Sequence, residues 1–374
     1  MMDDLSSIEH LPVELLNEIF DHLDTSAALS CAQVCRLWLA AARRVLYRRI
    51  ELSHQDLDRS VKLGHTLLIC TEARHSVRHI KITVDAHTDD VLLPHLAWIN
   101  DVREGQIQKV VLDDNTSRPS LPLLTSLLLK SPAGRSAQFL QLYGSFFDDD
   151  FHPSGTRAIE LQNLRRMNIS FAPGYDSPSW MLVHFPRLLM LDIKSSGYSP
   201  AMSVLLRTVS TSLQLLWLTW RTGNTDMGTS LQPCDQASLT GALSALTRLL
   251  SLSVDLNLSQ PAAVLDDAMP HLVSLKVLTC CRGAFSEVLF SRLPPTVVLL
   301  MLGSNTNDGF PRDNKFLRHG WIAAARVRSG ESALKYLWYF DHGDADIERE
   351  FAEECQNAGI DFLSVGLLMD SNQD

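Results

Sequence analysis

Residues 8–50 read IEHLPVELLNEIFDHLDTSAALSCAQVCRLWLAAARRVLYRRI, and this stretch decides the N-terminal part of the fold. Pro12 suits the first position of a helix, where its missing N–H would have no partner. Apolar residues then recur at helical spacing along this first helix. Residues 24–26 supply caps for a second helix over 27–34, and a third helix runs from Cys35 toward Tyr47. Three helices in about forty residues carry more apolar surface than so small a bundle can bury, which predicts a protein partner.

This stretch resembles the F-box, the adaptor-binding module of receptors in cullin-type ubiquitin ligases. The resemblance rests on an ordered set of residues: Leu11-Pro12-x-Glu14-Leu15, Ile19-Phe20, Leu23, Ala28-Leu29, Val34-Cys35-Arg36 and Trp38. An ordinary short helical hairpin would explain the helical spacing, but not the Leu-Pro start together with the Val-Cys-Arg-x-Trp element. The resemblance implies an F-box domain over residues 5–52 that binds a Skp1-like adaptor. It also implies the adaptor-facing residues, some of which must instead build the core of the module: Leu11, Pro12, Leu15, Ile19, Phe20, Leu23, Val34, Cys35 and Trp38.

Composition narrows the class of protein further. The 374 residues are 45% hydrophobic, which is ample for a large core, and the net charge of −10 provides no basic excess for nucleic acid. The seven cysteines are odd in number and contain no C-x-x-C pair, which favours reduced thiols in the cytosol or nucleus over disulfides or zinc. No secretory signal is visible, and no apolar stretch approaches the roughly 20 residues that span a bilayer. We therefore expect neither a nucleic acid nor a membrane as partner.

Beyond residue 50 the chain repeats a short strand pattern, apolar-x-x-apolar-x-apolar. The clearest of eleven copies are Leu188-x-x-Leu191-x-Ile193, Leu213-x-x-Leu216-x-Leu218, Leu249-x-x-Leu252-x-Val254, Leu272-x-x-Leu275-x-Val277 and Leu334-x-x-Leu337-x-Tyr339. The central apolar positions of all eleven copies are 80, 110, 140, 167, 191, 216, 252, 275, 299, 337 and 363. Their spacing is mostly within or near the range of about 20–29 residues found in leucine-rich repeats. Two longer gaps, around 226–247 and 305–332, leave room for an extra helix or loop.

We predict an α/β protein in which the small helical F-box bundle is followed by a leucine-rich-repeat-like solenoid over residues 53–374. Each unit would be a short parallel strand with a helical return, too small to bury its apolar face alone, so that neighbours stack on one core. The motif is degenerate and lacks the Asn or Cys ladder residue of regular repeats. A doubly wound α/β domain also alternates strands with helices, but no strand is followed by a Gly-rich phosphate turn. The region resembles the irregular repeats of many F-box receptors.

No catalytic or metal-binding constellation stands out. The G-x-S-x-G, P-loop and G-x-G-x-x-G patterns are absent. His75 and His79 do not share a helix face, because the second opens a predicted strand. The acidic run Asp148–Asp150 before His152 fits a solvated loop better than a metal site. We expect a non-catalytic chain without a cofactor, since the ubiquitin-transfer chemistry that the resemblance implies belongs to partner enzymes.

The candidate substrate-binding residues lie on the outward face of the predicted strands. Alternate strand residues point in opposite directions, so the residues between the apolar positions face away from the core. On this basis the outward positions in three of the later copies are Lys276 and Leu278, Leu300 and Leu302, and Trp338 and Phe340. Large aromatic residues are typical of interface hot spots. The four that interrupt this face are therefore predicted to hold a protein substrate, unless the insertions or the C-terminal helix cover them: Tyr143, Trp217, Trp338 and Phe340.

The function predicted from the sequence is substrate recognition in an SCF-type (Skp1–cullin–F-box) ubiquitin ligase. The F-box would bind the Skp1-like adaptor and, through it, the cullin, and the solenoid would bind a protein target of unknown identity. The alternative is a non-catalytic scaffold with no role in degradation, and an α/β enzyme is the third candidate.

Overall fold

The chain forms two compact units in its computed structural model. The structure describes residues 11–84, 89–114, 128, 131–143, 159–171, 183–195, 197–220, 231–256, 263–281, 284–303, 317, 319–340 and 345–364. Unit 1 comprises residues 1–146 and 161–164, and unit 2 comprises residues 147–160 and 165–374. Each unit is described by itself below.

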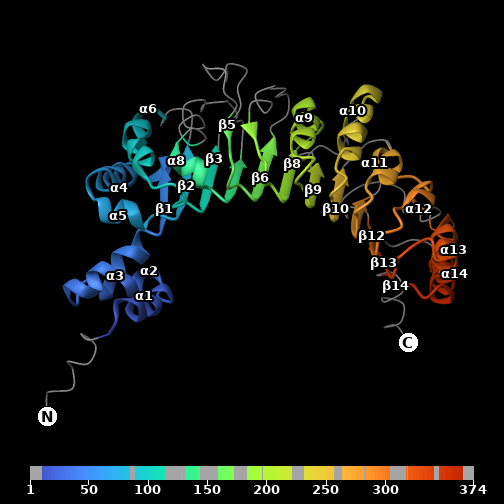
Figure 1. Cartoon of the computed structure of the whole chain (residues 1–374), viewed down its shortest axis with the longest axis horizontal. Coiled ribbons are helices and arrows are strands. Elements are labelled where there is room, and N and C mark those ends of the chain that lie inside the picture. Colours follow the sequence, from blue (N-terminus) through green and yellow to red (C-terminus); the bar gives the residue numbers. More distant parts are fainter. Residues whose placement is uncertain are drawn as a thin grey trace, which may run out of the picture. The chain divides into compact units, whose positions relative to one another are not determined.

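Unit 1 begins with three helices and continues with parallel strands that alternate with helices (Figure 1). Its strands follow the order β1-β2-β3-β4, and every neighbouring pair is parallel. Its elements are α1 (Val13–Asp21), α2 (Thr25–Cys31), α3 (Arg36–Leu46), β1 (Arg49–Ser53), η2 (His54–Asp56), α4 (Leu57–Ile69), α5 (Thr71–Ser76), β2 (His79–Val84), α6 (Asp89–Leu92), η3 (Leu93–Asp101), β3 (Lys109–Asp114), α8 (Pro132–Ser136) and β4 (Phe139–Tyr143).

Unit 2 repeats the same alternation. Its main strands follow the order β6-β8-β9-β10-β11-β12-β13-β14, all parallel, and the short strands β5 and β7 pair separately. Its elements are β5 (Ile159–Glu160), β6 (Arg166–Phe171), β7 (Val183–His184), β8 (Met190–Ser195), α9 (Pro200–Thr208), β9 (Leu215–Trp220), α10 (Pro233–Ser244), β10 (Ser251–Leu256), α11 (Val264–Ala268), η5 (Met269–His271), β11 (Val277–Cys281), α12 (Leu289–Arg292), β12 (Leu299–Gly303), α13 (Trp321–Arg328), β13 (Tyr336–Tyr339), α14 (Ala345–Asn357) and β14 (Asp361–Ser364).

Successive strands of unit 2 enter the sheet in the same way. The N–H groups of Leu250 and Ser251 both donate to the carbonyl of Gln214, 2.8 and 3.0 Å away. The strand that follows repeats this pattern on the carbonyl of Leu250, and the strand after that repeats it on the carbonyl of Lys276. The repeated contact keeps neighbouring strands in one register, so corresponding residues of consecutive strands lie side by side.

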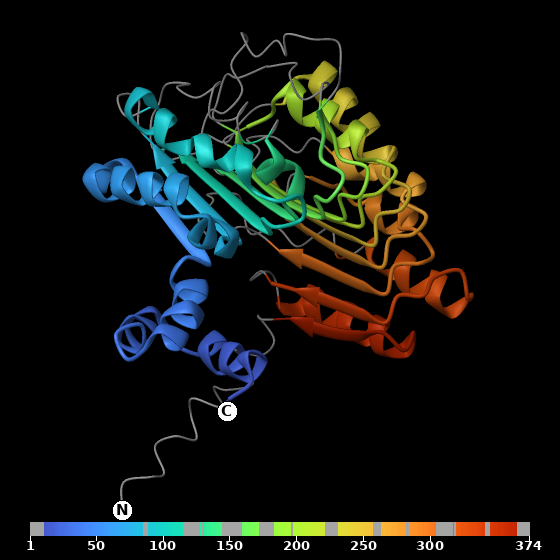
Figure 2. The same cartoon turned by 60° about the vertical axis from the view of Figure 1, so that its left-hand side comes forward.

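The core of unit 2 lies between the strands and the helices on one of their faces (Figure 2). Strands β9 and β10 alternate strictly between partly exposed and buried residues, as a strand with one covered face requires. A doubly wound sheet would need helices on both faces. Among the described elements, the helices that follow the strands of unit 2 lie on one face. The predicted mixed α/β organisation, helices first and then parallel strands with helical returns, is confirmed.

Helices are present at the predicted positions between strands in the part of the chain that the structure describes. Helices α10 and α13 occupy the two long gaps of the repeat. Helix α14 is followed by Gly359, which adopts the left-handed conformation at φ +76°. The N–H of Ile360 donates to the carbonyl of Cys355 over 2.8 Å, which closes the helix end in a Schellman motif.

Three of the predicted strand registers are wrong. In β11 the residues that face the core are Leu278 and Cys280, three positions after the predicted pair, and in β12 they are Leu300 and Leu302, one position later. In β14 Phe362 pairs with Leu337 and turns inward, while Leu363 is exposed. The residues predicted to face outward, Leu278, Leu300 and Leu302, are therefore core residues, and Lys276 precedes its strand. An odd shift in register moves every side chain to the opposite face.

Strand β1 was not predicted. Ile50 and Leu52 face the core and pair with Ile80 and Ile82 of β2, so the first strand follows α3 directly. The helical bundle and the first strands thus belong to one compact unit.

Two helical glycines have different surroundings, so replacing each by alanine should change the free energy of unfolding in opposite directions. Gly64 of α4 is buried, and a Cβ there would lie 2.7 Å from the carbonyl oxygen of His95 in η3. Gly241 of α10 is open, with the flexible Arg207 guanidinium 3.7 Å away as its nearest neighbour. Alanine gains about 1 kcal/mol over glycine in a helix, whereas overpacking costs about 1–3 kcal/mol. We expect Gly64→Ala to lower the free energy of unfolding by about 1–2 kcal/mol, because a backbone carbonyl cannot rotate away.

Gly241→Ala is the matched control, and we expect it to raise the free energy of unfolding by up to about 1 kcal/mol. Urea denaturation followed by circular dichroism measures both. A stabilised Gly64→Ala variant would mean that α4 and η3 are not in close contact.

Candidate functional site

The three N-terminal helices form a module with a small core of its own. Asp24 caps α2 by accepting from the N–H of Ala27 over 2.7 Å, so the helix begins two residues earlier than predicted. The rings of Phe20 and Trp38 pack edge to face, 5.8 Å apart. The buried core consists of Leu16, Phe20, Ala41 and Ala42, and partly buried residues pack around it: Leu23, Cys31, Ala32, Trp38, Val45 and Leu46.

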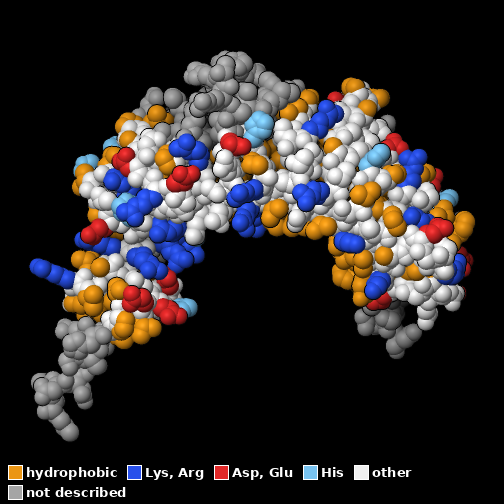
Figure 3. Space-filling model, viewed as in Figure 1, with side chains coloured by type: hydrophobic (Ala, Val, Ile, Leu, Met, Phe, Trp, Pro, Cys, Tyr) orange, Lys and Arg blue, Asp and Glu red, His pale blue; other side chains and the backbone are white. Residues whose placement is uncertain are grey.

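The same module exposes many apolar side chains. Leu15 and Ile19 lie one turn apart on α1 and are 47% and 50% exposed, and Val34, between α2 and α3, is 63% exposed. Figure 3 shows hydrophobic side chains gathered over these helices. A domain of this size rarely leaves so many large apolar residues in water unless a partner covers them. The exposed set is Val13, Leu15, Ile19, Leu29, Val34 and Leu37.

The structure sorts the nine residues that the sequence assigned to the adaptor. Leu15, Ile19, Val34 and Pro12 are exposed, whereas Leu11 and Cys35 are partly exposed. Phe20 is only 2% exposed and belongs to the core of the module, so its side chain offers no surface to a partner. Leu23 and Trp38 pack against that core and contribute at most one edge. Sequence reasoning did not select Val13, Leu29 and Leu37. Leu29 belongs to the ordered set on which the F-box resemblance rests, and that is the signal that could have found it.

Polar contacts hold the module together and tie it to the rest of unit 1. The carboxylate of Asp21 accepts from Arg44 over 2.9 Å and from Arg48 over 3.1 Å. Arg43 donates to Glu72 of α5 over 3.1 Å. All of these side chains are partly exposed, so each ion pair contributes less than about 1 kcal/mol and mainly sets the orientation of α3.

A second apolar surface lies on the open face of the strands of unit 2. The rings of Trp338 and Phe340 pack edge to face at 6.2 Å, and Phe340 is 43% exposed. The strand register places Trp217, Ser253, Thr279, Met301 and Trp338 in one row across β9 to β13. Figure 3 shows hydrophobic side chains gathered along this part of the strands. We name the outward residues at its C-terminal end the aromatic face: Val277, Leu299, Met301, Tyr336, Trp338, Phe340 and Leu363.

The four predicted aromatics do not form one cluster. Trp338 and Phe340 are neighbours, whereas Trp217 lies four strands away, about 19 Å at the usual strand spacing. Tyr143 belongs to unit 1, where its hydroxyl contacts the amide of Gln141. The C-terminal helix α14 does not cover these aromatics, because its Phe351 packs against Phe290 of α12 and Phe362, on the helical side of the strands.

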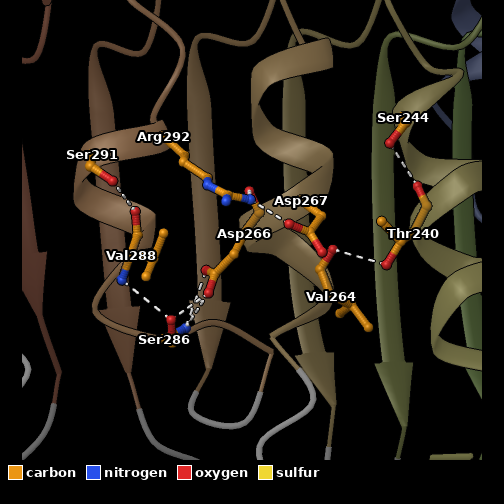
Figure 4. A network of polar contacts seen from close by, with 9 residues as sticks. All are labelled: Thr240, Ser244, Val264, Asp266, Asp267, Ser286, Val288, Ser291 and Arg292. Atoms are coloured by element: carbon orange, nitrogen blue, oxygen red, sulfur yellow. Dashed lines mark hydrogen bonds and ion pairs between the residues drawn. The ribbon is translucent and has the colours of Figure 1, made fainter. Parts of the chain in front are cut away.

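Buried ionisable groups outside these surfaces have structural roles. Asp266 of α11 accepts hydrogen bonds from the backbone and hydroxyl of Ser286, and Arg292 donates to the carboxylate of Asp267 (Figure 4). Burial raises the pKa of Asp266, and the bonds from Ser286 oppose that shift. This network fastens the segment after β11 to α11.

Neither a metal-binding cluster nor a buried thiolate is present among the described residues. They contain no group of three or more His, Cys, Asp or Glu side chains placed to hold a metal ion. Burial raises the pKa of the Cys355 thiol to about 12 and that of Cys280 well above its ordinary value, so neither is a thiolate nucleophile. His75 lies in α5 and His79 opens β2, as predicted. The candidate run 148–150 and His152 lie outside the described residues.

Comparison with known proteins identifies the helical module. Residues 8–53 match the F-box-like family, which covers α1, α2, α3 and β1. No curated protein matches the chain. In the part of the chain that is described, no helix has both the length and the apolar character needed to cross a bilayer. The chain therefore carries an F-box-like domain, followed by parallel strands that alternate with helices.

Proposed function

We propose that this chain is the substrate-recognition subunit of an SCF-type ubiquitin ligase. Its F-box-like domain would bind a Skp1-like adaptor and, through that adaptor, a cullin. The observation that carries the proposal is the pair Leu15 and Ile19, half exposed on a small module that matches the F-box-like family. An apolar anchor gains about 1.5–3 kcal/mol on complete burial, so several such anchors can offset the entropy lost in association.

The adaptor complex is tested with the full chain. Co-expression with a Skp1-like adaptor is expected to give an equimolar complex in size-exclusion chromatography. A folded chain that elutes alone, with the adaptor in excess, would contradict the proposal.

We further propose that the strands and helical returns form a leucine-rich-repeat-like solenoid whose aromatic face holds the protein target. Two observations support this. Consecutive strands pair in parallel with corresponding residues side by side, and no described helix lies over that face. Trp338 and Phe340 are large and partly exposed, and they are pre-packed against one another. Such side chains lose little conformational entropy on binding and are typical of hot spots.

Replacement of both aromatics tests the substrate surface. We expect Trp338→Ala/Phe340→Ala in the adaptor-bound chain to reduce capture of its partners at least about 30-fold, because even one hot-spot residue contributes about 2 kcal/mol or more. Quantitative affinity capture measures the change. The matched control is Trp321→Ala, a tryptophan of α13 that is 55% exposed outside the aromatic face. Equal partner sets for both variants would contradict the assignment.

One further measurement separates the receptor from the scaffold. Partners held by the aromatic face should accumulate when the cullin ligase is inhibited if the chain directs degradation. Their levels should stay constant if the chain is a scaffold, in which case the adaptor complex would still form.

A further inference from the structure

Unit 1 contains a pocket in which three of the five wall residues are arginines. It has a volume of about 300 Å³, and its walls are Arg44, Arg48, Ser76, Arg78 and Gln108. Figure 3 shows Lys and Arg side chains gathered where α3 meets the beginning of β1 and β2. The proposed adaptor and substrate surfaces use none of these residues.

The strand register brings three of the five wall residues together. Arg48, Arg78 and Gln108 each stand immediately before a strand, β1, β2 and β3 respectively. The N–H of Arg78 donates to the carbonyl of Arg48 over 2.9 Å, and the N–H of Gln108 donates to the carbonyl of Arg78 over 2.8 Å. Consecutive members are therefore one strand spacing apart, about 4.8 Å. Arg44 reaches the same pocket from α3.

The charges at the pocket do not cancel. Asp21 pairs with Arg44 and Arg48, so three guanidinium groups share one carboxylate and a charge of +2 remains. Within the part of the chain that the structure describes, no carboxylate pairs with Arg78. Its Nη1 instead donates to the carbonyls of His75 and Val77, over 2.7 and 2.9 Å. Those two bonds hold the guanidinium in place before any ligand arrives.

A second basic row adjoins the first. Arg49, His79 and Lys109 are the first residues of β1, β2 and β3 and are aligned by the register. Burial lowers the pKa of Arg78, and the neighbouring Arg44 and Arg48 lower it further. Burial and the charge of Arg49 likewise lower the pKa of His79. Both shifts are those expected where positive charge is concentrated and partly shielded from water.

We propose that this pocket binds a phosphate monoester group. A phosphoryl dianion matches the excess of two positive charges, and its oxygens match the planar forks of Arg48 and Arg78. Ser76 and Gln108 add neutral donors on the same walls. The group could be carried by a free sugar phosphate or by a phosphorylated side chain of a protein, because both present the same dianion.

Calorimetric titration of the full chain tests the site, with inorganic phosphate as the first probe. We expect saturable binding that Arg48→Ala weakens about tenfold or more. Arg78→Lys keeps the charge but removes the fork, and we expect a loss of similar size. Arg43→Ala is the matched control, because Arg43 is next to the wall residue Arg44 on α3 but pairs with Glu72 instead of lining the pocket. It should leave the affinity unchanged. Circular dichroism confirms that each variant is folded.

Three results would overturn the proposal. They are no saturable binding at millimolar phosphate, full affinity in a folded Arg48→Ala variant, or an equal loss in Arg43→Ala, which would indicate diffuse surface charge. Titration with glucose 6-phosphate and with a phosphoserine peptide then distinguishes the two sources, and tighter binding of either one supports the site. None of these titrations requires the adaptor, so their outcome is independent of the proposed ligase function.

Discussion

Leu300→Ala is expected to lower the free energy of unfolding by about 2–5 kcal/mol, whereas the adjacent Leu299→Ala should lower it by less than about 1 kcal/mol. Leu300 is fully buried in β12 and pairs with Leu278 and Leu337, which are also buried. Leu299 is the same residue type on the same strand, but it points to the open face and is partly exposed. Truncation of Leu300 removes buried methyl groups and leaves a cavity, while truncation of Leu299 mainly removes exposed surface.

Urea denaturation of the two variants beside the wild-type chain measures this difference. The comparison reports directly on strand register, because the two leucines differ only in the face that they occupy. A larger loss in Leu299→Ala would mean that β12 has the register that its sequence pattern first indicates.

The strands of the repeat could be predicted apart from β1, β5 and β7, but not the register of every strand. Leu252 and Val254 of β10 alternate with polar residues, so their core face can be identified from the sequence. In β12 the run from Val297 to Leu302 is apolar at every position, and such a run has no period that selects one face. The tertiary register, fixed by pairing with β11 and β13, decides instead.

The candidate binding surfaces could be predicted only in part from the sequence, for a similar reason. Helical spacing identified the apolar face of α1, but the face is wide enough to include both Phe20, which is buried, and Ile19, which is half exposed. Only packing against α3 separates them. The arginine pocket could have been found from spacing, since Arg48, Arg78 and Gln108 follow one another at intervals of 30 residues, immediately before each strand. A search for repeated apolar positions alone does not detect this row of polar residues.

Leu15→Ala/Ile19→Ala should weaken binding of a Skp1-like adaptor about 30-fold while leaving the F-box-like module folded. Each side chain is about half exposed in the chain alone, so the burial still to be gained on binding is worth about 1 kcal/mol apiece. A combined loss of about 2 kcal/mol corresponds to that factor. The core is spared because Leu16 and Phe20, which hold α1 against α3, are unchanged.

Two controls make the adaptor measurement specific. Glu18→Ala alters an exposed, charged residue of the same helix and should change the affinity less than threefold. Leu16→Ala removes a buried side chain of the core, and should lose adaptor binding together with part of the helical signal in circular dichroism. Binding is measured by calorimetric titration of the adaptor into each folded variant. If the double variant bound as tightly as the wild type, the exposed apolar face of α1 would have another occupant, and the ligase assignment would lose its physical basis.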